Sequence, residues 1–236
     1  MSMARRGYVP EDERDFSEKQ LPLIRRGLSD VRELVNRDYP VKSAATFVGN
    51  RYQLSERQRL AIMRAVTSDE MISKRLSKRL DRANGRVQAD GFNIIITLET
   101  ALSGTTLYRC MDGTVRDLAA MRGTYRILDC THRAADLFFE KVKSSGAEGA
   151  DIFLDAPVSN SGRLKSLLTE HGQAHGVDVS CELVPNADKV LMSKENVVTT
   201  DAIILNECKS WLNFAAEIIE EKLPGTRVIE LTDGRY

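Results

Sequence analysis

The sequence predicts an α/β fold with a mainly parallel sheet, preceded by a small all-helical domain. Before residue 86, apolar residues recur at steps of three and four, which is the spacing of amphipathic helices. After it, short apolar runs alternate with helical patterns, as in βα units. We therefore expect a flexible lead-in at 1–16, a basic helical module at 17–85 and an α/β domain at 86–236.

Four helices are expected in the helical module. The third opens at Ser55, because Gln58 stands three residues later and the pair forms a capping box. The fourth has a serine before its first acids and basic residues toward its end, which suits the helix dipole. The first expected helix starts at 21 and is ended by 38–40, and the second covers 44–48 and is closed by 49–50. The third is opened by 55 and extends to 66, and the fourth covers 68–82.

Strands and helices should alternate in the second half. A hairpin with a tight two-residue turn at Asp112-Gly113 is expected within 106–118. Asp188 is expected in a loop, and one long helix should run from about Ala202 to Leu223. Strands are expected at 87–89, 151–155, 179–184, 197–199 and 227–231, and further helices after 129 or 131 and after 162.

The segment from Asn93 to Thr100 is ambiguous. Its three consecutive isoleucines favour a strand on propensity alone. In that case Asp90 would stand at the amino end of the strand. If 87–89 is the strand instead and Asn93 starts a helix, Asp90 lies at the carboxyl edge of the sheet, and the pattern alone leaves both alternatives open.

Composition excludes several classes of protein. With 236 residues, 42% of them hydrophobic, the chain can bury a substantial core. No apolar run reaches membrane-spanning length and the first residues lack a signal-peptide core, so a cytoplasmic location without a membrane partner is expected. The four cysteines form no CxxC pair, which argues against a zinc site or a disulfide framework and favours reduced, buried thiols.

The net charge of zero hides an asymmetry between the two halves. Residues 1–86 contain 19 basic and 12 acidic residues, whereas 87–236 contain 15 basic and 22 acidic ones. The halves therefore carry +7 and −7. A polyanionic partner held by the basic half would explain this pattern, and so would charge complementarity between two packed domains.

Three expected strands end in an aspartate, at Asp90, Asp155 and Asp201, and Asp188 could reach the same place. The carboxyl ends of parallel strands share one edge, where ligands bind. Carboxylates gathered there repel one another, and a hard divalent cation such as Mg²⁺ or Mn²⁺ would relieve this repulsion. Such an ion supports phosphodiester hydrolysis. Each aspartate taken singly also fits a helix cap or a turn.

Short motifs carry a family resemblance. The strings DGFN at 90–93 and VVTTD at 197–201, with ADKVL at 187–191 between them, resemble the PIN-like nucleases, particularly their NYN branch. The resemblance covers 87–231 and implies a compact PIN-like α/β/α sandwich with a four- or five-stranded, mainly parallel sheet. It also implies a metal-dependent ribonuclease site, with a helix at Asn93. It implies metal-binding roles for Asp90, Asp188 and Asp201, an orienting role for Asn93, and a supporting hydroxyl at Thr199 or Thr200.

Other segments depart from the simplest PIN-like core, namely the hairpin at 107–118 and the loop DAPVSNSG at 155–162. Together with the string VGNRYQLSERQRLAIMRAV at 48–66, the loop makes the whole chain resemble an uncharacterised two-domain prokaryotic family of unknown function. That resemblance says nothing about activity.

Two further features could bind phosphate. The loop side chains Ser159, Asn160 and Ser161, with Arg163 as counter-charge, could hold phosphate at a helix start or simply cap the helix. Basic residues from Lys74 to Arg86 recur at steps of one, three and four, which fits either a stripe that contacts a nucleic-acid backbone or a solvated face. His171 and His175 lack a third ligand type nearby, so a metal site there is not expected.

The functional hypothesis is a metal-dependent nuclease that hydrolyses RNA. Four acids are expected both to bind the metal and to act in catalysis: Asp90, Asp155, Asp188 and Asp201. The residues expected to contact the substrate are Asn93, Ser159, Asn160, Ser161, Arg163, Thr199 and Thr200. The alternatives are a non-catalytic RNA-binding module and a small-molecule phosphate- or nucleotide-binding protein, although no GxxxxGK[ST] or GxGxxG motif is present. Self-association into a homo-oligomer stays open.

Overall fold

The fold is built around a five-stranded sheet in which every strand pairing is parallel. The structure is a computed structural model, and it describes residues 5–119 and 123–232. The strand order is β5-β4-β1-β6-β7, with β1 in the middle. The strands are β1 (Val87–Asp90), β4 (Ala150–Asp155), β5 (Val179–Val184), β6 (Val197–Val198) and β7 (Trp211–Leu212).

Helices cover both faces of this sheet, as expected for a sandwich. Side chains alternate between the faces along each strand. Ile152 and Leu154 join the larger core, whereas Phe153 joins the smaller one. The larger layer consists of α6 (Gly91–Leu102), α7 (Cys130–Ser144), α8 (Ser161–Ala174) and α11 (Phe214–Lys222), and the smaller of α9 (Ala187–Leu191) and α10 (Ala202–Glu207).

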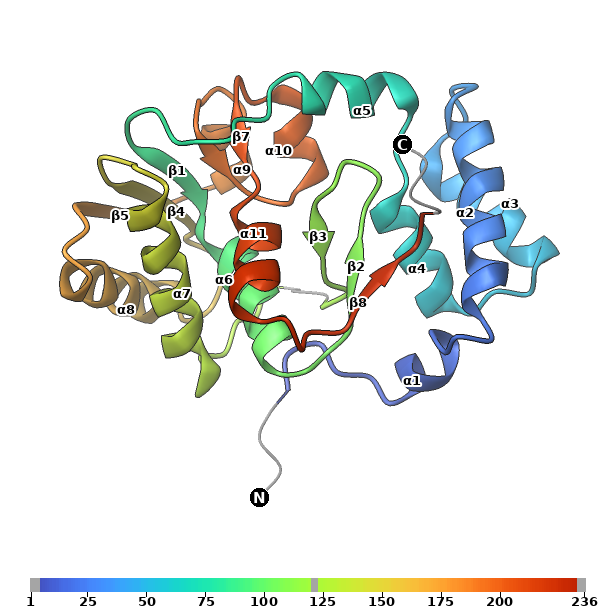
Figure 1. Ribbon diagram of the computed structural model, residues 1–236, viewed down its shortest axis with the longest axis horizontal. Coiled ribbons are helices and arrows are strands. Elements are labelled where there is room, and N and C mark those ends of the chain that lie inside the picture. The colour runs from blue at the N-terminus through green and yellow to red at the C-terminus, as the bar shows by residue number, and fades with distance from the viewer. Residues whose placement is uncertain (1–4, 120–122, 233–236) are drawn as a thin grey trace.

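The helical module lies on the other side of the molecule, at the right in Figure 1. The expected capping box opens α4, since Ser55 accepts from the Gln58 backbone and the Gln58 side chain accepts from Ser55. Within the expected lead-in, α1 is folded and Phe16 is fully buried, while residues 1–4 lie outside the described residues. The helices are α1 (Glu11–Asp15), α2 (Leu21–Val35), α3 (Val41–Arg51), α4 (Glu56–Ala65) and α5 (Asp69–Leu76).

A second, three-stranded sheet lies between the helical module and the α/β layers (Figure 1). Its strands are β2 (Leu107–Arg109), β3 (Val115–Arg116) and β8 (Val228–Glu230), with β2 antiparallel to β3 and parallel to β8. Tyr108 and Ile229 from this sheet belong to the core of the helical module. The expected last strand therefore exists, but it packs under the helices and not in the main sheet.

The hairpin of this second sheet differs in its turn from the expected one. Cys110 N–H donates to the Thr114 carbonyl, and Gly113 N–H donates to the Cys110 carbonyl. Within the loop at 111–113, Gly113 alone has a positive φ, at 79°. The loop thus has three residues, 111–113, and not two. A tight turn over 110–113 is followed by the pairing of Cys110 with Thr114, and Gly113 adopts the left-handed conformation that this loop type requires.

The ambiguous segment at 93–100 is helical and forms most of α6. The Asp90 carboxylate accepts from the Asn93 backbone N–H, so it caps the helix directly after β1. All residues from Ile94 to Ala101 are buried, because α6 has the sheet on one side and α7 and α11 on others. Burial all round explains why an isoleucine-rich run forms a helix here.

The expected long helix at 202–223 is wrong, since α10 and α11 are separated by the edge strand β7. The Lys78 ammonium donates to the carbonyls of Leu205, Asn206 and Cys208 and so occupies the carboxyl end of α10. Trp211 then pairs with the chain at 78–80, accepting from Leu80 N–H and donating to the Lys78 carbonyl. Contacts from the helical module therefore end α10 and build the sheet edge.

A buried charge network joins the three parts of the molecule. Asp112, at the hairpin tip, contacts Arg75 of α5 at 2.5 Å and Arg116 of β3 at 2.6 Å. Burial raises the pKa of Asp112, but the charges of Arg116 and Arg75 outweigh it and lower the pKa to about 2. Much of the charge asymmetry between the halves is thus internal complementarity, as in the Arg6–Glu99 and Arg79–Glu217 pairs.

The cysteines are free thiols, and three of the four are buried, as expected. Among the residues that the structure describes, no helix is both long enough and apolar enough to cross a membrane.

Candidate metal and phosphate site

A cavity of about 330 Å³ opens at the carboxyl ends of the main strands, and we call it the aspartate pocket. Five of its lining side chains are aspartates, contributed by β1, β4, the first turn of α9, the N-cap of α10 and the chain after β3. The lining residues are Arg64, Asp90, Phe92, Asn93, Ile96, Arg116, Asp117, Ala119, Asp155, Asp188, Thr200 and Asp201.

Asp90 is the most buried of these acids, with 7% of its surface exposed. Burial raises its pKa to about 7, with further increases from the negative charges of Asp201 and Asp188. Hydrogen bonds from the Asn93 backbone and the Thr199 hydroxyl oppose this rise. A carboxylate in a cavity whose pKa is raised by burial and by neighbouring acids is typical of a functional site.

Asn93 connects the two motif strings in space. Its side-chain oxygen accepts from the Thr200 backbone N–H at 2.7 Å and lies 3.1 Å from the Thr200 hydroxyl. The Thr199 hydroxyl lies 3.1 Å from Asp90 Oδ2 and accepts from the Asp201 backbone N–H. These bonds fix the loop that carries Asp201 against the start of α6.

Asp201 and Asp155 each commit one carboxylate oxygen to the fold. Asp201 Oδ1 caps α10 by accepting from Ile203 N–H at 2.7 Å and from Ile204 N–H at 3.3 Å. Asp155 Oδ1 accepts from the Ala187 N–H at 2.9 Å, which fixes the start of α9. Asp201 is therefore a helix cap, as one alternative from the sequence had it. Its second oxygen accepts no hydrogen bond within the described chain, so that oxygen is free to bind a ligand.

Asp188 lies in the first turn of α9 and not in a loop. Burial raises its pKa, and the negative charges of Asp201 and Asp155 raise it further. Its carboxylate accepts no hydrogen bond from any residue in 5–119 or 123–232. Asp188 is thus an acid whose side chain has no structural task in the described part of the molecule.

Three charged residues of the lining are not among the site residues expected from the sequence. Asp117 follows β3 as the other acids follow their strands, so its position after a strand was an available signal. Its Oδ2 accepts from Thr97 and its Oδ1 from the Ala119 N–H. Arg116 and Arg64 have no local signal, because only the tertiary fold brings the hairpin and α4 to the sheet edge.

The donor set of the aspartate pocket fits a hard divalent cation. Its ionisable ligands are carboxylates without histidine or cysteine, which favours Mg²⁺ or Mn²⁺ over zinc. Within 5–119 and 123–232, no three His, Cys, Asp or Glu side chains come close enough to form a ready-made cage. This arrangement suits an ion that takes one or two carboxylates and completes its shell with water and substrate oxygens, as Mg²⁺ does.

The loop at 159–161 lies outside the pocket lining, and its side chains bond to the protein itself. The Ser159 hydroxyl and the Asn160 amide bond to the backbone of Tyr125, and the Ser161 hydroxyl donates to the Ala156 carbonyl. Arg163 is exposed on α8. All three polar side chains therefore have partners within the protein: Ser159 and Asn160 hold the chain at Tyr125, and Ser161 bonds within its own loop.

The basic stripe expected at 74–86 is not a free surface. Helix α5 ends at Leu76, and Arg75 is buried against Asp112. Lys78 caps α10, and Arg86 pairs with Asp151 and Asp178. These residues bind the α/β layers, which leaves little of the stripe for a partner.

Comparison with known proteins supports a two-part organisation. Residues 24–78 match a family described as "Protein of unknown function (DUF434)", and residues 79–217 match "Domain of unknown function (DUF5616)". "Uncharacterized protein MJ0935" of Methanocaldococcus jannaschii is 35% identical over 202 residues, covering 84% of this chain and 97% of that protein.

No solved structure matches the chain. The expected resemblance to a two-domain family of unknown function is confirmed, while neither description mentions a PIN-like domain. Because the second match spans more than half of the chain, this protein belongs to the family described as "Domain of unknown function (DUF5616)", preceded by a segment that matches DUF434.

Proposed function

We propose that this protein is a metal-dependent ribonuclease whose aspartate pocket hydrolyses phosphodiester bonds with Mg²⁺ or Mn²⁺, on a PIN-like domain of the NYN type. One observation carries the proposal: four acids on four separate elements, Asp90, Asp155, Asp188 and Asp201, line one cavity at the carboxyl edge of the sheet. Structural caps alone do not require four acids to converge.

The PIN-like assignment is supported by local geometry as well as by the strings. An acid ends the first strand, Asn93 lies in the first turn of the next helix, and the Thr-Thr-Asp string follows β6. Asn93 and Thr199 link these two places through hydrogen bonds.

In the proposed reaction, one or two carboxylates would hold the ion, with water and substrate oxygens completing its shell. The candidates are Asp188 and the uncommitted oxygens of Asp155 and Asp201, and Asp90 is a further candidate once its proton is lost. The bound ion supplies a lowered pKa for its water and stabilises charge on the phosphate. Asn93 and Thr199 keep Asp90 and Asp201 in position. The pocket volume of about 330 Å³ leaves room for a phosphate beside the acids.

Charge makes substrate binding dependent on the ion. The pocket has five aspartates against two arginines, so a polyanion meets a negative wall when no cation is bound. A non-catalytic RNA-binding module would instead need a free basic surface, and the stripe at 74–86 is largely engaged in internal contacts.

The test is cleavage of single-stranded RNA by wild-type protein and by Asp201→Asn. Asparagine also caps helices well, so the variant should keep its melting temperature within about 2 °C, since the expected change is a few tenths of a kcal/mol. Cleavage should require Mg²⁺ or Mn²⁺ and fall at least about 100-fold in the variant. Asp81→Asn, an exposed acid outside the pocket, is the control and should cleave normally.

Cleavage that survives in Asp201→Asn would contradict the proposal. Metal-independent RNA binding without cleavage of any substrate would favour the binding-module alternative.

A further inference from the structure

We propose, on the basis of the function proposed above, that Arg64 of the helical module binds a phosphate of the RNA substrate beside the aspartate pocket. Both parts of the chain would then build the substrate site. The DUF5616 domain would hold the ion, and the DUF434-like segment would contact a phosphate.

The position of Arg64 is fixed by its backbone. It lies in the last turn of α4 and lines the aspartate pocket. Its carbonyl accepts from Arg116 Nη1 at 2.6 Å, and the next carbonyl, of Ala65, accepts from the Met111 N–H at 3.0 Å. These two bonds tie the end of α4 to the hairpin, so the side chain starts from a rigid base at the pocket.

Arg64 is an exposed residue, and its guanidinium has no hydrogen-bond or ion-pair partner within the described residues. Arg116, the other arginine of the pocket, is buried, and its guanidinium donates to the Thr200 carbonyl, the Arg64 carbonyl and Asp112. Arg57 of the same helix is paired with Asp12. Of the two pocket arginines, Arg64 is therefore the one whose donors can turn to a ligand.

Electrostatics favours a phosphate at this place. Burial raises the pKa of Asp117, and the positive charge of Arg64 partly offsets that rise, so the guanidinium field reaches the pocket. A planar guanidinium can donate two parallel hydrogen bonds to one phosphate. Since the side chain is already solvated at the rim, binding requires little reorganisation of the protein. The contacted phosphate would neighbour the one held at the ion.

The test measures the affinity of the full-length protein for labelled single-stranded RNA in the presence of Mn²⁺, with Asp201→Asn as background so that RNA is not cut. Adding Arg64→Ala should weaken RNA binding about 10-fold or more. The affinity of the Arg64→Lys protein should lie between that of the Arg64→Ala protein and that of the parent. The slope of log affinity against log salt should fall by about 0.7, the value for one lost phosphate contact to a single strand.

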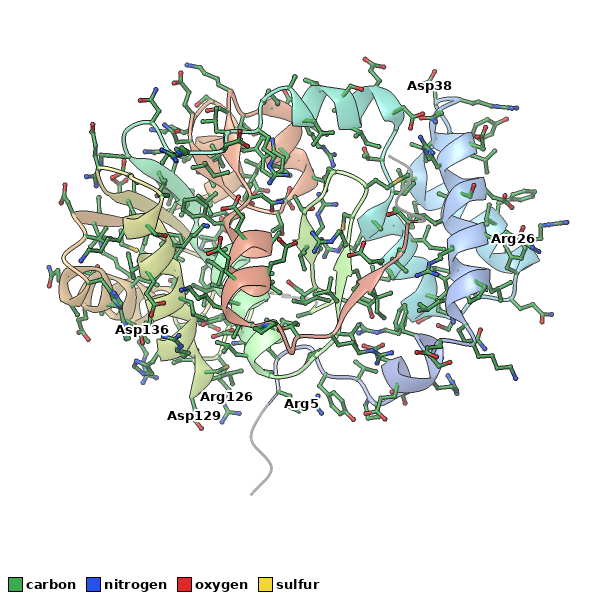
Figure 2. The ribbon with its side chains drawn as sticks, in the orientation of Figure 1. Arg5, Arg26, Asp38, Arg126, Asp129 and Asp136 are labelled. Atoms are coloured by element: carbon green, nitrogen blue, oxygen red, sulfur yellow. The ribbon has the colours of Figure 1, made fainter. Side chains whose placement is uncertain are left out.

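Arg26→Ala is the matched control, because it removes the same charge from an exposed residue on the outer side of α2, at the right in Figure 2. Its effect on affinity should stay below about twofold, since long-range effects of one exposed charge are screened. Thermal unfolding with and without Mn²⁺ should be the same for Arg64→Ala and for its parent.

Equal affinity and equal salt slope for the Arg64→Ala and Arg26→Ala proteins would overturn the inference while leaving the ribonuclease proposal intact. If wild-type protein neither binds nor cleaves RNA with Mn²⁺, the ribonuclease proposal fails first, and the role of Arg64 is rejected with it.

Discussion

The side-chain oxygen of Asn93 accepts a hydrogen bond from the backbone N–H of Thr200, with 2.7 Å between the oxygen and the nitrogen. Asn93 lies in the first turn of α6, and Thr200 lies in the loop after β6. Two strings more than 100 residues apart thus become one structural unit, which holds Asp90 and Asp201 on the same cavity.

Replacing Asn93 by Ala should weaken both the fold and the site. The Thr200 N–H is buried, with the residue 3% exposed, and would lose its acceptor. We expect the free energy of unfolding to drop by about 1–3 kcal/mol, the cost of an unsatisfied buried group. Denaturant unfolding measures this. Asn84→Ala, an exposed asparagine whose backbone alone is bonded to Asn196, should change stability by no more than about 0.5 kcal/mol.

Gly91 allows α6 to start directly on β4. A Cβ at this position would lie 2.6 Å from Leu154 Cδ2 and 2.8 Å from Ile152 Cγ2. Gly91→Ala should therefore destabilise the protein by about 1–3 kcal/mol through overpacking. It should also impair cleavage, because Asp90 precedes Gly91 directly.

Gly162→Ala is the matched control for Gly91→Ala. Gly162 is in the first turn of α8, and nothing lies within 4 Å of an added Cβ. Alanine should stabilise the protein by up to about 1 kcal/mol by restricting the unfolded chain. If both variants unfold at the same denaturant concentration, close packing at Gly91 is refuted.

Asp112→Ala should be among the most damaging single changes. It leaves Arg75 and Arg116 buried without their shared counter-charge, with side-chain exposures of 3% and 6%. Breaking such a pair costs about 3–5 kcal/mol. Asp178→Ala, whose side chain is 79% exposed beside Arg86, should cost no more than about 1 kcal/mol. Similar losses in the two variants would show that the network does not join the parts of the molecule.

Metal-free protein should lose stability as pH rises from about 4 to about 7. The pKa of Asp90 is about 7 in the folded state against 3.8 as the ordinary value, so the folded state binds more protons in this window. The stabilisation that Asp90 contributes is therefore fully present below pH 3.8 and is lost as the pH rises to about 7. Mn²⁺ should raise the melting temperature at pH 8 more than at pH 5.5, because binding needs the deprotonated carboxylate. A melting temperature shift by Mn²⁺ that is independent of pH would contradict this.

Some of this architecture was predictable because it depends on local chemistry or on a general rule of sheets. The capping box at Ser55 and Gln58 needs only neighbouring residues. The meeting of Asp90, Asp155 and Asp201 follows from the shared edge of parallel strands. The fold class was likewise predicted, since alternating βα patterns favour a parallel sheet.

Other features depend on distant contacts and left no local signal. The apolar periodicity continues from Ala202 to Leu223, yet Lys78 ends α10 and the pairing of Trp211 with 78–80 makes a strand. Arg64 reaches the aspartate pocket only because the hairpin holds the end of α4 there. Likewise, the isoleucines of α6 favour a strand locally, and only packing on several sides makes the helix stable.

The most direct test of the central claim is calorimetric titration of Mn²⁺ into the full-length protein at pH 8, wild type against Asp188→Asn. Asp188 is the suitable position because its carboxylate accepts no hydrogen bond within the described residues, so the change should leave the fold intact. Wild-type protein should bind Mn²⁺ saturably, and the variant should bind at least about 10-fold more weakly. Equal affinity in the two proteins, or no binding in either, would contradict a divalent-cation site in the aspartate pocket.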